Sequence, residues 1–221
     1  INVDTAGASL PLNQDWKVSF KPGLGAPESV RLSELHSLSK HETPGVKFYS
    51  GISTYEKAFS VPAEMMDPTK VTRLDLGQVK SAAEVILNGR HLGILWKPPF
   101  QVDVTGLLRT GENDLQIKVA NNWPNRMIGD EQEPDDCTWS HIISWPHGDQ
   151  PEPVGRSLSV IPDWVINKTP RPSAGRVTFS TWKFFDKDSP LLESGLLGPV
   201  KLDTAHRFTL EPSSKSEDHK D

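Results

Sequence analysis

Five carboxylates form the group of side chains in this sequence that is best suited to acid–base chemistry. They fall in one short stretch: Asp130, Glu131, Glu133, Asp135 and Asp136. Hydrolysis of a glycosidic bond needs two carboxyl groups, about 5–5.5 Å apart for retention of configuration and about 6.5–9.5 Å apart for inversion. Neighbouring residues on an irregular loop can reach that spacing, which makes Asp130 and Glu131 candidate catalytic residues.

The same carboxylates have two other interpretations. Calcium prefers oxygen-rich turns, so Asp135 and Asp136 are possible calcium ligands, and no other cofactor is expected. The group can also be a solvated loop, or a loop held in place by pairing with Arg126. A motif of this kind is only a hypothesis, and all three alternatives stay open at this point.

A second candidate site precedes the carboxylates. Trp123, Asn125 and Arg126 have the composition of a sugar subsite. Asparagine offers both a donor and an acceptor to a hydroxyl group, and arginine offers a rigid fork of donors. The alternative is a loop fixed by pairing of Arg126 with an acidic neighbour, because arginine is as often a structural clamp as a ligand contact.

Two Trp–Lys pairs are further candidates for contact with sugar. Trp96 and Lys97 come at the end of an expected strand, where the loops that build sites begin. Trp182 and Lys183 repeat the pair later in the chain. A buried indole beside a lysine whose stem lies along apolar surface is the alternative. We expect that alternative for Trp182 and leave Trp96 open between the two.

Length and composition bound the class of protein. The 221 residues carry a net charge of −5, and without a long Lys/Arg cluster nucleic acid is a poor candidate partner. The single cysteine, Cys137, excludes an internal disulfide. No apolar run reaches the ~20 residues of a membrane span. No signal peptide is evident, and Ile1 in place of a methionine leads us to expect a mature or excised fragment.

The residues from Ala83 to Ala120 predict two β-hairpins. Asn88-Gly89 is the preferred pair for a two-residue type I′ turn, because both positions need positive φ. Apolar and polar side chains then alternate in two runs, as they do in half-buried strands: Phe100, Val102 and Val104, followed by Leu115, Ile117 and Val119.

Further strands are expected along most of the chain. The alternation predicts them at residues 12–20, 49–61, 70–76, 176–185 and 198–203, with a short strand and a helical turn in residues 29–38. About eight to ten strands with closely spaced turns predict an all-β fold, a β-sandwich or jelly roll.

Regular alternation stops after Ala120. Residues 121–172 are rich in proline and tryptophan and show little periodicity. Because such a stretch is too long for a plain connector, we expect a long irregular loop excursion from a single β-sandwich domain that covers residues 1–212. The polar residues 213–221 are expected to be disordered.

Three segments resemble the sugar-binding domain of glycoside hydrolase family 2, which has a galactose-binding-domain-like fold. They are residues 49–59 (YSGISTYEKAF), residues 83–120 with V-I-L-N-G-R-H-L-G, and residues 194–200 (SGLLGPV). A narrower resemblance, to the terminal sandwich domain of bacterial α-L-rhamnosidases of family 106, is carried by residues 123–132, 181–183 and 187–192.

The resemblance implies a carbohydrate-binding module that is accessory to, or derived from, a rhamnosidase-like enzyme that degrades polysaccharides. A poly- or oligosaccharide and a catalytic glycosidase domain are the partners it implies, with a secreted or periplasmic location in a bacterium. In such enzymes the catalytic carboxylates lie on a separate barrel, so a non-catalytic domain is expected. The alternatives are a stand-alone hydrolase of rhamnose- or uronate-containing glycans that works from residues 130–136, and a purely structural domain of a larger enzyme.

Overall fold

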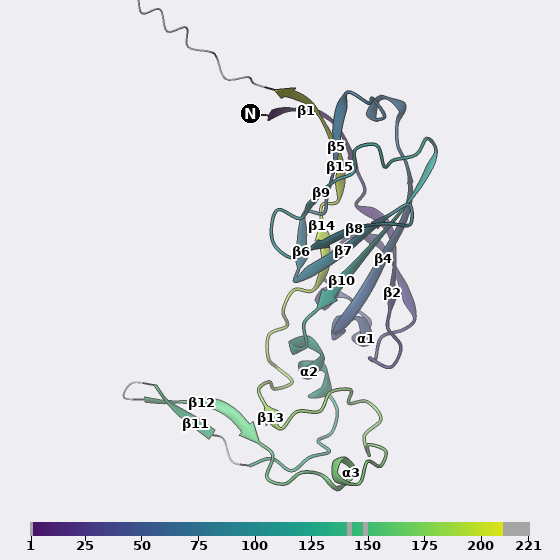
Figure 1. Cartoon of the computed structure of the whole chain (residues 1–221). Helices are drawn as coiled ribbons and strands as arrows, with labels where there is room; N and C mark the ends of the chain where they lie inside the picture. Colours follow the sequence, from purple (N-terminus) through teal and green to yellow (C-terminus); the bar gives the residue numbers. More distant parts are fainter. Residues whose placement is uncertain (1, 141–142, 148–149, 210–221) are drawn as a thin grey trace, which may run out of the picture.

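Two antiparallel layers of strands make up most of the molecule, in a computed structural model that describes residues 2–140, 143–147 and 150–209 (Figure 1). Among these residues, the larger layer has six strands in the order β3 (Ser29–Glu34), β2 (Gln14–Phe20), β4 (Gly51–Ser60), β10 (Glu112–Asn121), β7 (Ala82–Leu87) and β8 (Arg90–Leu95). The other layer has four, in the order β1 (Asn2–Pro11), β15 (Lys201–Thr209), β5 (Lys70–Asp75) and β9 (Gln101–Asp103). The predicted all-β sandwich is confirmed.

The strands form because apolar side chains alternate with polar ones along them. In β10, Leu115, Ile117 and Val119 are buried in the core between the layers, as their spacing predicts. Trp16 of β2 and Tyr55 of β4 meet edge to face in the same core, with their ring centroids 6.3 Å apart. Burial of this single face holds the register of each strand, since a shift by one residue would expose the whole set.

The turn between β7 and β8 has the predicted conformation. Asn88 has a φ of 52° and Gly89 a φ of 78°, which is the pair of positive values that a type I′ turn requires. The Asn88 side chain donates a hydrogen bond to the side chain of Asn113 at 2.9 Å. The turn is therefore fixed to the start of β10 as well as joining β7 to β8.

A tyrosine joins the larger layer to the short two-stranded sheet of β14 (Gly195–Gly198) and β6 (Gln78–Lys80). The Leu196 N–H donates to the hydroxyl of the fully buried Tyr55 at 3.1 Å. Gly195 has a φ of 89°, and a Cβ there would lie 2.3 Å from the same hydroxyl. Only glycine fits this position, which accounts for the Ser-Gly pair that begins residues 194–200.

Short helices connect the strands. They are η1 (Leu38–Lys40), α1 (Pro44–Lys47) and η2 (Ala63–Met65). The strand followed by a helical turn that was predicted in residues 29–38 is present as β3 and the start of η1. Strands predicted at residues 12–20, 49–61 and 70–76 are also present, with ends that differ by at most a few residues.

Three points of the strand prediction need correction. The second predicted hairpin does not form, because β9 pairs with β5 in one layer and β10 pairs with β4 and β7 in the other. The first strand, β1, was not predicted, although it pairs with β15 along nearly its whole length. The strand predicted over residues 176–185 is reduced to β13 (Trp182–Lys183). The Val177 and Thr178 N–H groups donate to the side chain of Asp130, so a carboxylate takes the place of a neighbouring strand.

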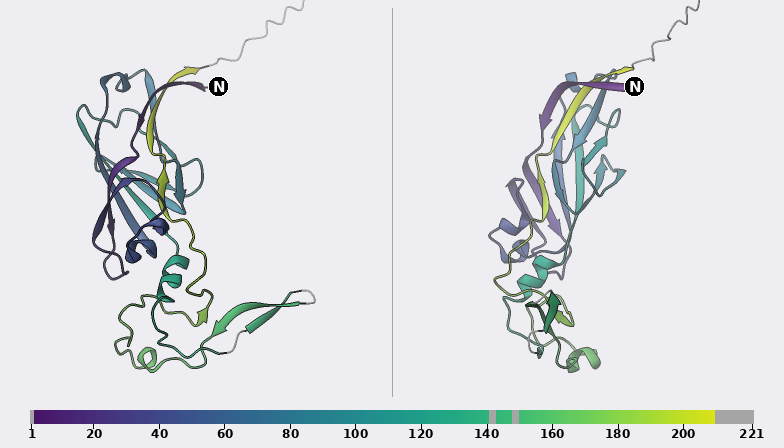
Figure 2. Two further views of the ribbon diagram at one scale, coloured as in Figure 1. Left: turned by 180° about the vertical axis from the view of Figure 1, so that it is seen from behind. Right: turned by 90° about the vertical axis from the view of Figure 1, so that its left-hand side faces the viewer.

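The irregular part of the chain lies at one end of the sandwich. The excursion runs from the end of β10 to the start of β14 and contains α2 (Pro124–Asp130), β11 (Ile143–His147), β12 (Gln150–Ser157), α3 (Asp163–Ile166) and β13. Figures 1 and 2 place it at the end opposite the N-terminus and β15, with the β11–β12 hairpin projecting sideways. It ends later than the predicted residue 172. The predicted tail, residues 213–221, lies outside the described residues.

No helix in the described part of the chain is long and apolar enough to span a membrane.

The hydrogen bond at Tyr55 yields a prediction about stability. Replacing Tyr55→Phe leaves the Leu196 N–H buried without an acceptor, which should lower the free energy of unfolding by about 1–3 kcal/mol. Burial raises the pKa of Tyr55 to about 12, so the neutral phenol favours the folded state. That contribution is complete below pH about 10 and is lost as the pH rises to about 12.

Urea denaturation at several pH values measures both effects. The fall in stability between pH about 10 and about 12 should be smaller in Tyr55→Phe than in the parent protein. In Tyr49→Phe, which keeps Tyr55, the part of the fall that Tyr55 causes should remain. An equal fall in Tyr55→Phe and the parent would contradict this role for the buried hydroxyl.

Candidate functional site

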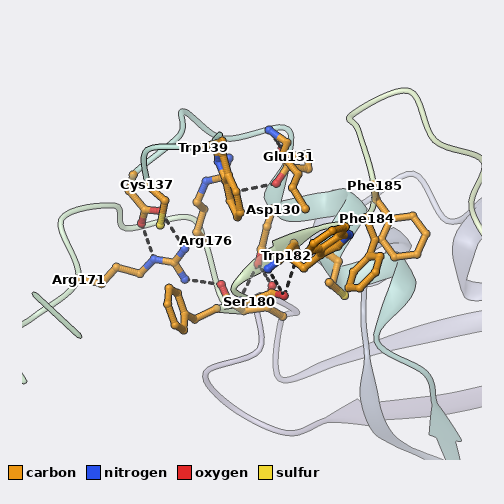
Figure 3. Close-up of a pocket in the computed structure, with 15 residues that line it drawn as sticks. Asp130, Glu131, Cys137, Trp139, Arg171, Arg176, Ser180, Trp182, Phe184 and Phe185 are labelled. Atoms are coloured by element: carbon orange, nitrogen blue, oxygen red, sulfur yellow. Dashed lines mark hydrogen bonds and ion pairs between the residues drawn. The ribbon is translucent and has the colours of Figure 1, made fainter. Parts of the chain in front are cut away.

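The carboxylates that follow α2 are held by cations from a later part of the chain (Figure 3). Glu131 contacts Arg176 Nη1 through one oxygen at 3.0 Å and Lys183 Nζ through the other at 2.5 Å. Asp135 accepts a hydrogen bond from Arg176 Nη2 at 2.8 Å. Burial alone would lower the pKa of Arg176, but the hydrogen bond and charge of Glu131 and the other nearby carboxylates raise it. The arrangement clamps the segment after α2 to β13.

Asp130 has a different set of partners. Its side chain is buried, and Oδ1 lies 2.9 Å from Arg126 Nε. The same carboxylate accepts hydrogen bonds from the N–H groups of Val177 at 3.0 Å and Thr178 at 2.6 Å, and from the Thr178 hydroxyl at 2.5 Å. A carboxylate with this many donors fixes the path of the backbone opposite to it.

Asp136 is held in its ionised form. Burial alone would raise its pKa, but hydrogen bonds from Arg171 and Ser173 and the charge of Arg171 outweigh that effect and lower the pKa to about 2. Both oxygens of Asp136 are engaged, and Asp135 is paired with Arg176. These residues do not fit calcium, because cations already occupy the oxygens. The described residues contain no group of three or more side chains that could hold a metal ion.

The geometry does not favour catalysis by this cluster. A general acid must present its carboxyl group to the substrate, whereas Glu131 and Asp130 each direct an oxygen to a cationic side chain. The cavity beside them measures about 30 Å³, room for only one or two water molecules. The catalytic role of Asp130 and Glu131 stays a prediction. Their observed contacts with Arg126, Arg176 and Lys183 hold the backbone of the excursion in place.

The predicted tryptophans lie in three different settings. Trp96 is 70 % exposed at the end of β8, with Lys97 Nζ 5.3 Å from its ring centroid. Trp123 is 50 % exposed and precedes α2. Trp182 is partly buried, lines the small cavity of Figure 3 and lies 5.8 Å from the ring of Phe184. Trp96 and Trp123 are therefore open to a ligand, while Trp182 packs within the excursion.

A polar pocket lies where the excursion leaves and rejoins the sandwich. This junction pocket has a volume of about 200 Å³ and is lined by Val79, Lys80, Ser81, Asn121, Asn122, Asn125, Leu192, Glu193 and Ser194. Lys80 and Glu193 form an ion pair of 2.8 Å in which both side chains are partly exposed. Ser81 has a φ of 91°, a strained value of the kind that is often found at ligand-binding sites.

Two buried atoms of the junction pocket lack a hydrogen-bond partner among the described residues. They are Asn121 Oδ1 and Ser194 Oγ. The other atoms of these residues are engaged, since Asn121 Nδ2 donates to the Gly51 carbonyl at 3.0 Å and the Ser194 N–H donates to Ser37 Oγ at 3.0 Å. Both residues are held firmly, and each keeps one buried polar atom without a partner among the described residues.

Asn125 and Arg126, which the sequence suggested as one subsite, belong to opposite sides of α2. The Asn125 side chain donates to the Leu192 carbonyl at 2.8 Å and accepts from the Leu192 N–H at 2.9 Å. It lines the junction pocket, whereas Arg126 lines a separate groove beside α1. The two side chains therefore line different pockets, and the structure does not bring them together at one subsite.

Sequence reasoning missed most of the junction pocket. Lys80, Asn121, Asn122, Glu193 and Ser194 were not among the candidates, because they come from segments far apart in the chain. The one available signal was the pair of asparagines directly after the alternating residues of β10.

Fold and sequence together define a domain class found in glycoside hydrolases. The chain belongs to the family described as glycosyl hydrolase 2 galactose-binding domain-like, whose pattern matches residues 47–170. This range begins before β4 and covers part of the sandwich and the larger part of the excursion.

Longer proteins share this domain. A protein of Formosa agariphila named "Putative beta-glucuronidase" is 46 % identical over 187 residues, which make up 85 % of this chain and 15 % of that protein. A rhamnosidase structure from a Novosphingobium species is 33 % identical with a TM-score of 0.66, over 91 % of this chain and 15 % of that one. A β-glucuronidase structure from Bifidobacterium dentium, at 20 % identity and a TM-score of 0.52 over 90 % of this chain and 30 % of that one, shares the fold. The chain thus spans only a small part of each relative.

The clamp at Asp136 gives a second prediction. Replacing Asp136→Asn removes the charge that Arg171 contacts, so the excursion should open more often while the sandwich stays folded. The pKa of Asp136 is lowered from 3.8 to about 2, so its stabilising effect is present above pH about 4 and is lost as the pH falls to about 2.

Hydrogen exchange of the backbone amides around Arg171 and Ser173 measures this opening. Exchange should be faster in Asp136→Asn than in the parent protein at pH about 6, and the two should become alike toward pH about 2. Asp188→Asn, at an exposed position, is the matched control and should behave as the parent does. Equal exchange in all three proteins at pH about 6 would contradict the clamp.

Proposed function

We propose that this chain is the sandwich domain of a larger glycoside hydrolase and that its junction pocket binds one sugar residue of the substrate. The observation that carries the proposal is the pair of buried, unpartnered atoms, Asn121 Oδ1 and Ser194 Oγ. A buried polar atom without a partner costs about 1–3 kcal/mol. Sugar hydroxyls both donate and accept hydrogen bonds, so one ligand can satisfy the two atoms together.

The size and rim of the junction pocket suit part of a sugar. Its volume of about 200 Å³ is below the ~300–1,000 Å³ of pockets that enclose drug-sized ligands, so most of an oligosaccharide would extend outside. Lys80 and Glu193 at the rim offer charged donors and acceptors to further hydroxyls. The rest of the sugar chain would then be available to a second domain.

The partner in this proposal is a catalytic domain that carries the acid–base carboxylates. Two observations support it: the carboxylates after α2 are paired with cations, and the relatives are several times longer than this chain. We further propose a rhamnosidase-like enzyme, as in family 106, that acts on rhamnose- or uronate-containing glycans. One relative is named a rhamnosidase and another a putative β-glucuronidase, and these names support a substrate that contains rhamnose or a uronate. A polysaccharide substrate favours a secreted or periplasmic location.

The unpartnered hydroxyl offers a direct test. Replacing Ser194→Ala removes a buried oxygen that has no partner in the described residues, so the melting temperature should stay equal or rise. Affinity for rhamnose- and uronate-containing oligosaccharides, measured by titration calorimetry, should fall about 5–10-fold with the loss of one hydrogen bond.

Ser37→Ala serves as the contrasting variant. Ser37 Oγ accepts the Ser194 N–H, so this change should lower the melting temperature. If Ser194→Ala binds the oligosaccharides as tightly as the parent protein does, the proposed contact is wrong.

Trp96 gives a second candidate contact with glycan. Its indole is 70 % exposed, and an exposed aromatic ring can bury a large area of a ligand. Trp96→Ala should therefore weaken retention on a glycan affinity gel while the melting temperature stays nearly unchanged. Ile94→Ala, at a neighbouring position that is 66 % exposed, is the control. A large drop in melting temperature for Trp96→Ala would instead assign this indole to packing.

A further inference from the structure

A second groove lies on the other side of α2. It has a volume of about 950 Å³ and runs between the β2–β3 turn, α1, α2 and residues 174–177. Figures 1 and 2 place α1 next to α2, at the end of the sandwich from which the excursion hangs. We name it the Arg126 groove, after the residue of α2 that contributes the central cation. It shares no lining residue with the junction pocket.

Arg126 is buried, yet its donors are unused. Its side chain is 7 % exposed, and its Nε lies 2.9 Å from Asp130 Oδ1. That contact lacks the alignment of a hydrogen bond, and neither Nη1 nor Nη2 donates to any residue that the structure describes. A guanidinium group has five N–H donors in a fixed plane. A ligand that presents acceptors would supply the partners that these donors lack among the described residues.

Two glycines pack directly against these nitrogens. A Cβ at Gly25 would lie 2.9 Å from Arg126 Nη1, and one at Gly129 would lie 2.6 Å from Nη2. Any other residue at either position would press on the guanidinium group. Both glycines line the groove together with Arg126, so the lack of a side chain at these positions lets the guanidinium group lie in the groove wall.

The charges around the groove favour a neutral ligand. Asp130 already balances the charge of Arg126, and Glu131 and Asp135 balance that of Arg176. The walls also carry Lys47 together with Glu42 and Glu133. A carboxylate ligand would meet these two acidic side chains at a cost in repulsion. Hydroxyl groups accept from the guanidinium and donate to the carboxylates. Phe48, which is partly buried, adds an apolar surface to the wall.

We propose that the Arg126 groove is a second carbohydrate-binding site, for a neutral sugar whose adjacent hydroxyls accept hydrogen bonds from Nη1 and Nη2 of Arg126. The inference takes its ligand class from the proposed function and adds a site that the junction pocket does not include. A glycan held at both sites would be gripped on both sides of α2.

The test is an NMR titration of the chain with defined sugars. The probes are a neutral galacto-oligosaccharide, a neutral rhamno-oligosaccharide and an acidic oligogalacturonate. Signals of the backbone amides of Gly25, Gly45, Gly129 and Gly175, all of which line the groove, should shift with a neutral probe. The acidic probe should shift them less at the same concentration.

Two variants and one control complete the test. Arg126→Lys keeps the positive charge beside Asp130 but loses the planar fork, and should weaken binding in the groove about tenfold. Ala174→Trp fills the groove from an exposed position without altering Arg126, so it tests the site even if Arg126→Lys fails to fold. Ser194→Ala should leave the glycine shifts unchanged.

The outcomes separate this inference from the proposed function. Shifts at Asn122 and Ser194 without shifts at the four glycines would overturn the Arg126 groove and leave the junction pocket standing. Glycine shifts that persist in both Arg126→Lys and Ala174→Trp would also overturn it, as would a preference for the acidic probe. Absence of shifts at both sites with every probe would overturn both proposals.

Discussion

One side chain closes the long excursion, and the arrangement of the site depends on it. Asn125 forms two hydrogen bonds with the backbone of Leu192, one to its carbonyl and one from its N–H, at 2.8 and 2.9 Å. The amide side chain donates and accepts one hydrogen bond each, as the backbone of a neighbouring strand does. It brings the residues that leave β10 next to those that enter β14, and the junction pocket is the space between them. Asn121 and Ser194, which Gly51 and Ser37 also hold, lie on the two sides of this closure.

Beyond this closure, the excursion is held by charge and little by apolar burial. Cationic side chains of Arg171, Arg176 and Lys183 engage the carboxylates that follow α2. The same pairing that fixes the loop occupies the carboxylate oxygens, which a general acid would have to present to a substrate. These carboxylates therefore cannot both hold the excursion in place and act on a substrate. Their observed contacts hold the excursion in place.

The sequence predicts the local features of this structure well. The Asn88-Gly89 turn and the alternation in β10 are encoded within a few residues, and both are present. The remainder depends on long-range pairing. The strand expected over residues 176–185 fails because Asp130 captures two of its N–H groups, and the junction pocket joins segments that are far apart in the chain. Composition suggested one subsite for Asn125 and Arg126, and only the fold shows that they line different pockets.

Contact between a sugar and the junction pocket is the central claim, and intermolecular NOEs test it most directly. Val79 and Leu192 supply the methyl groups of the junction pocket, so a bound sugar residue should give NOEs from its ring protons to both. Those NOEs, seen with a rhamnose- or uronate-containing oligosaccharide, are the predicted result. NOEs to the Trp96 indole alone, with none to either methyl group, would contradict the account.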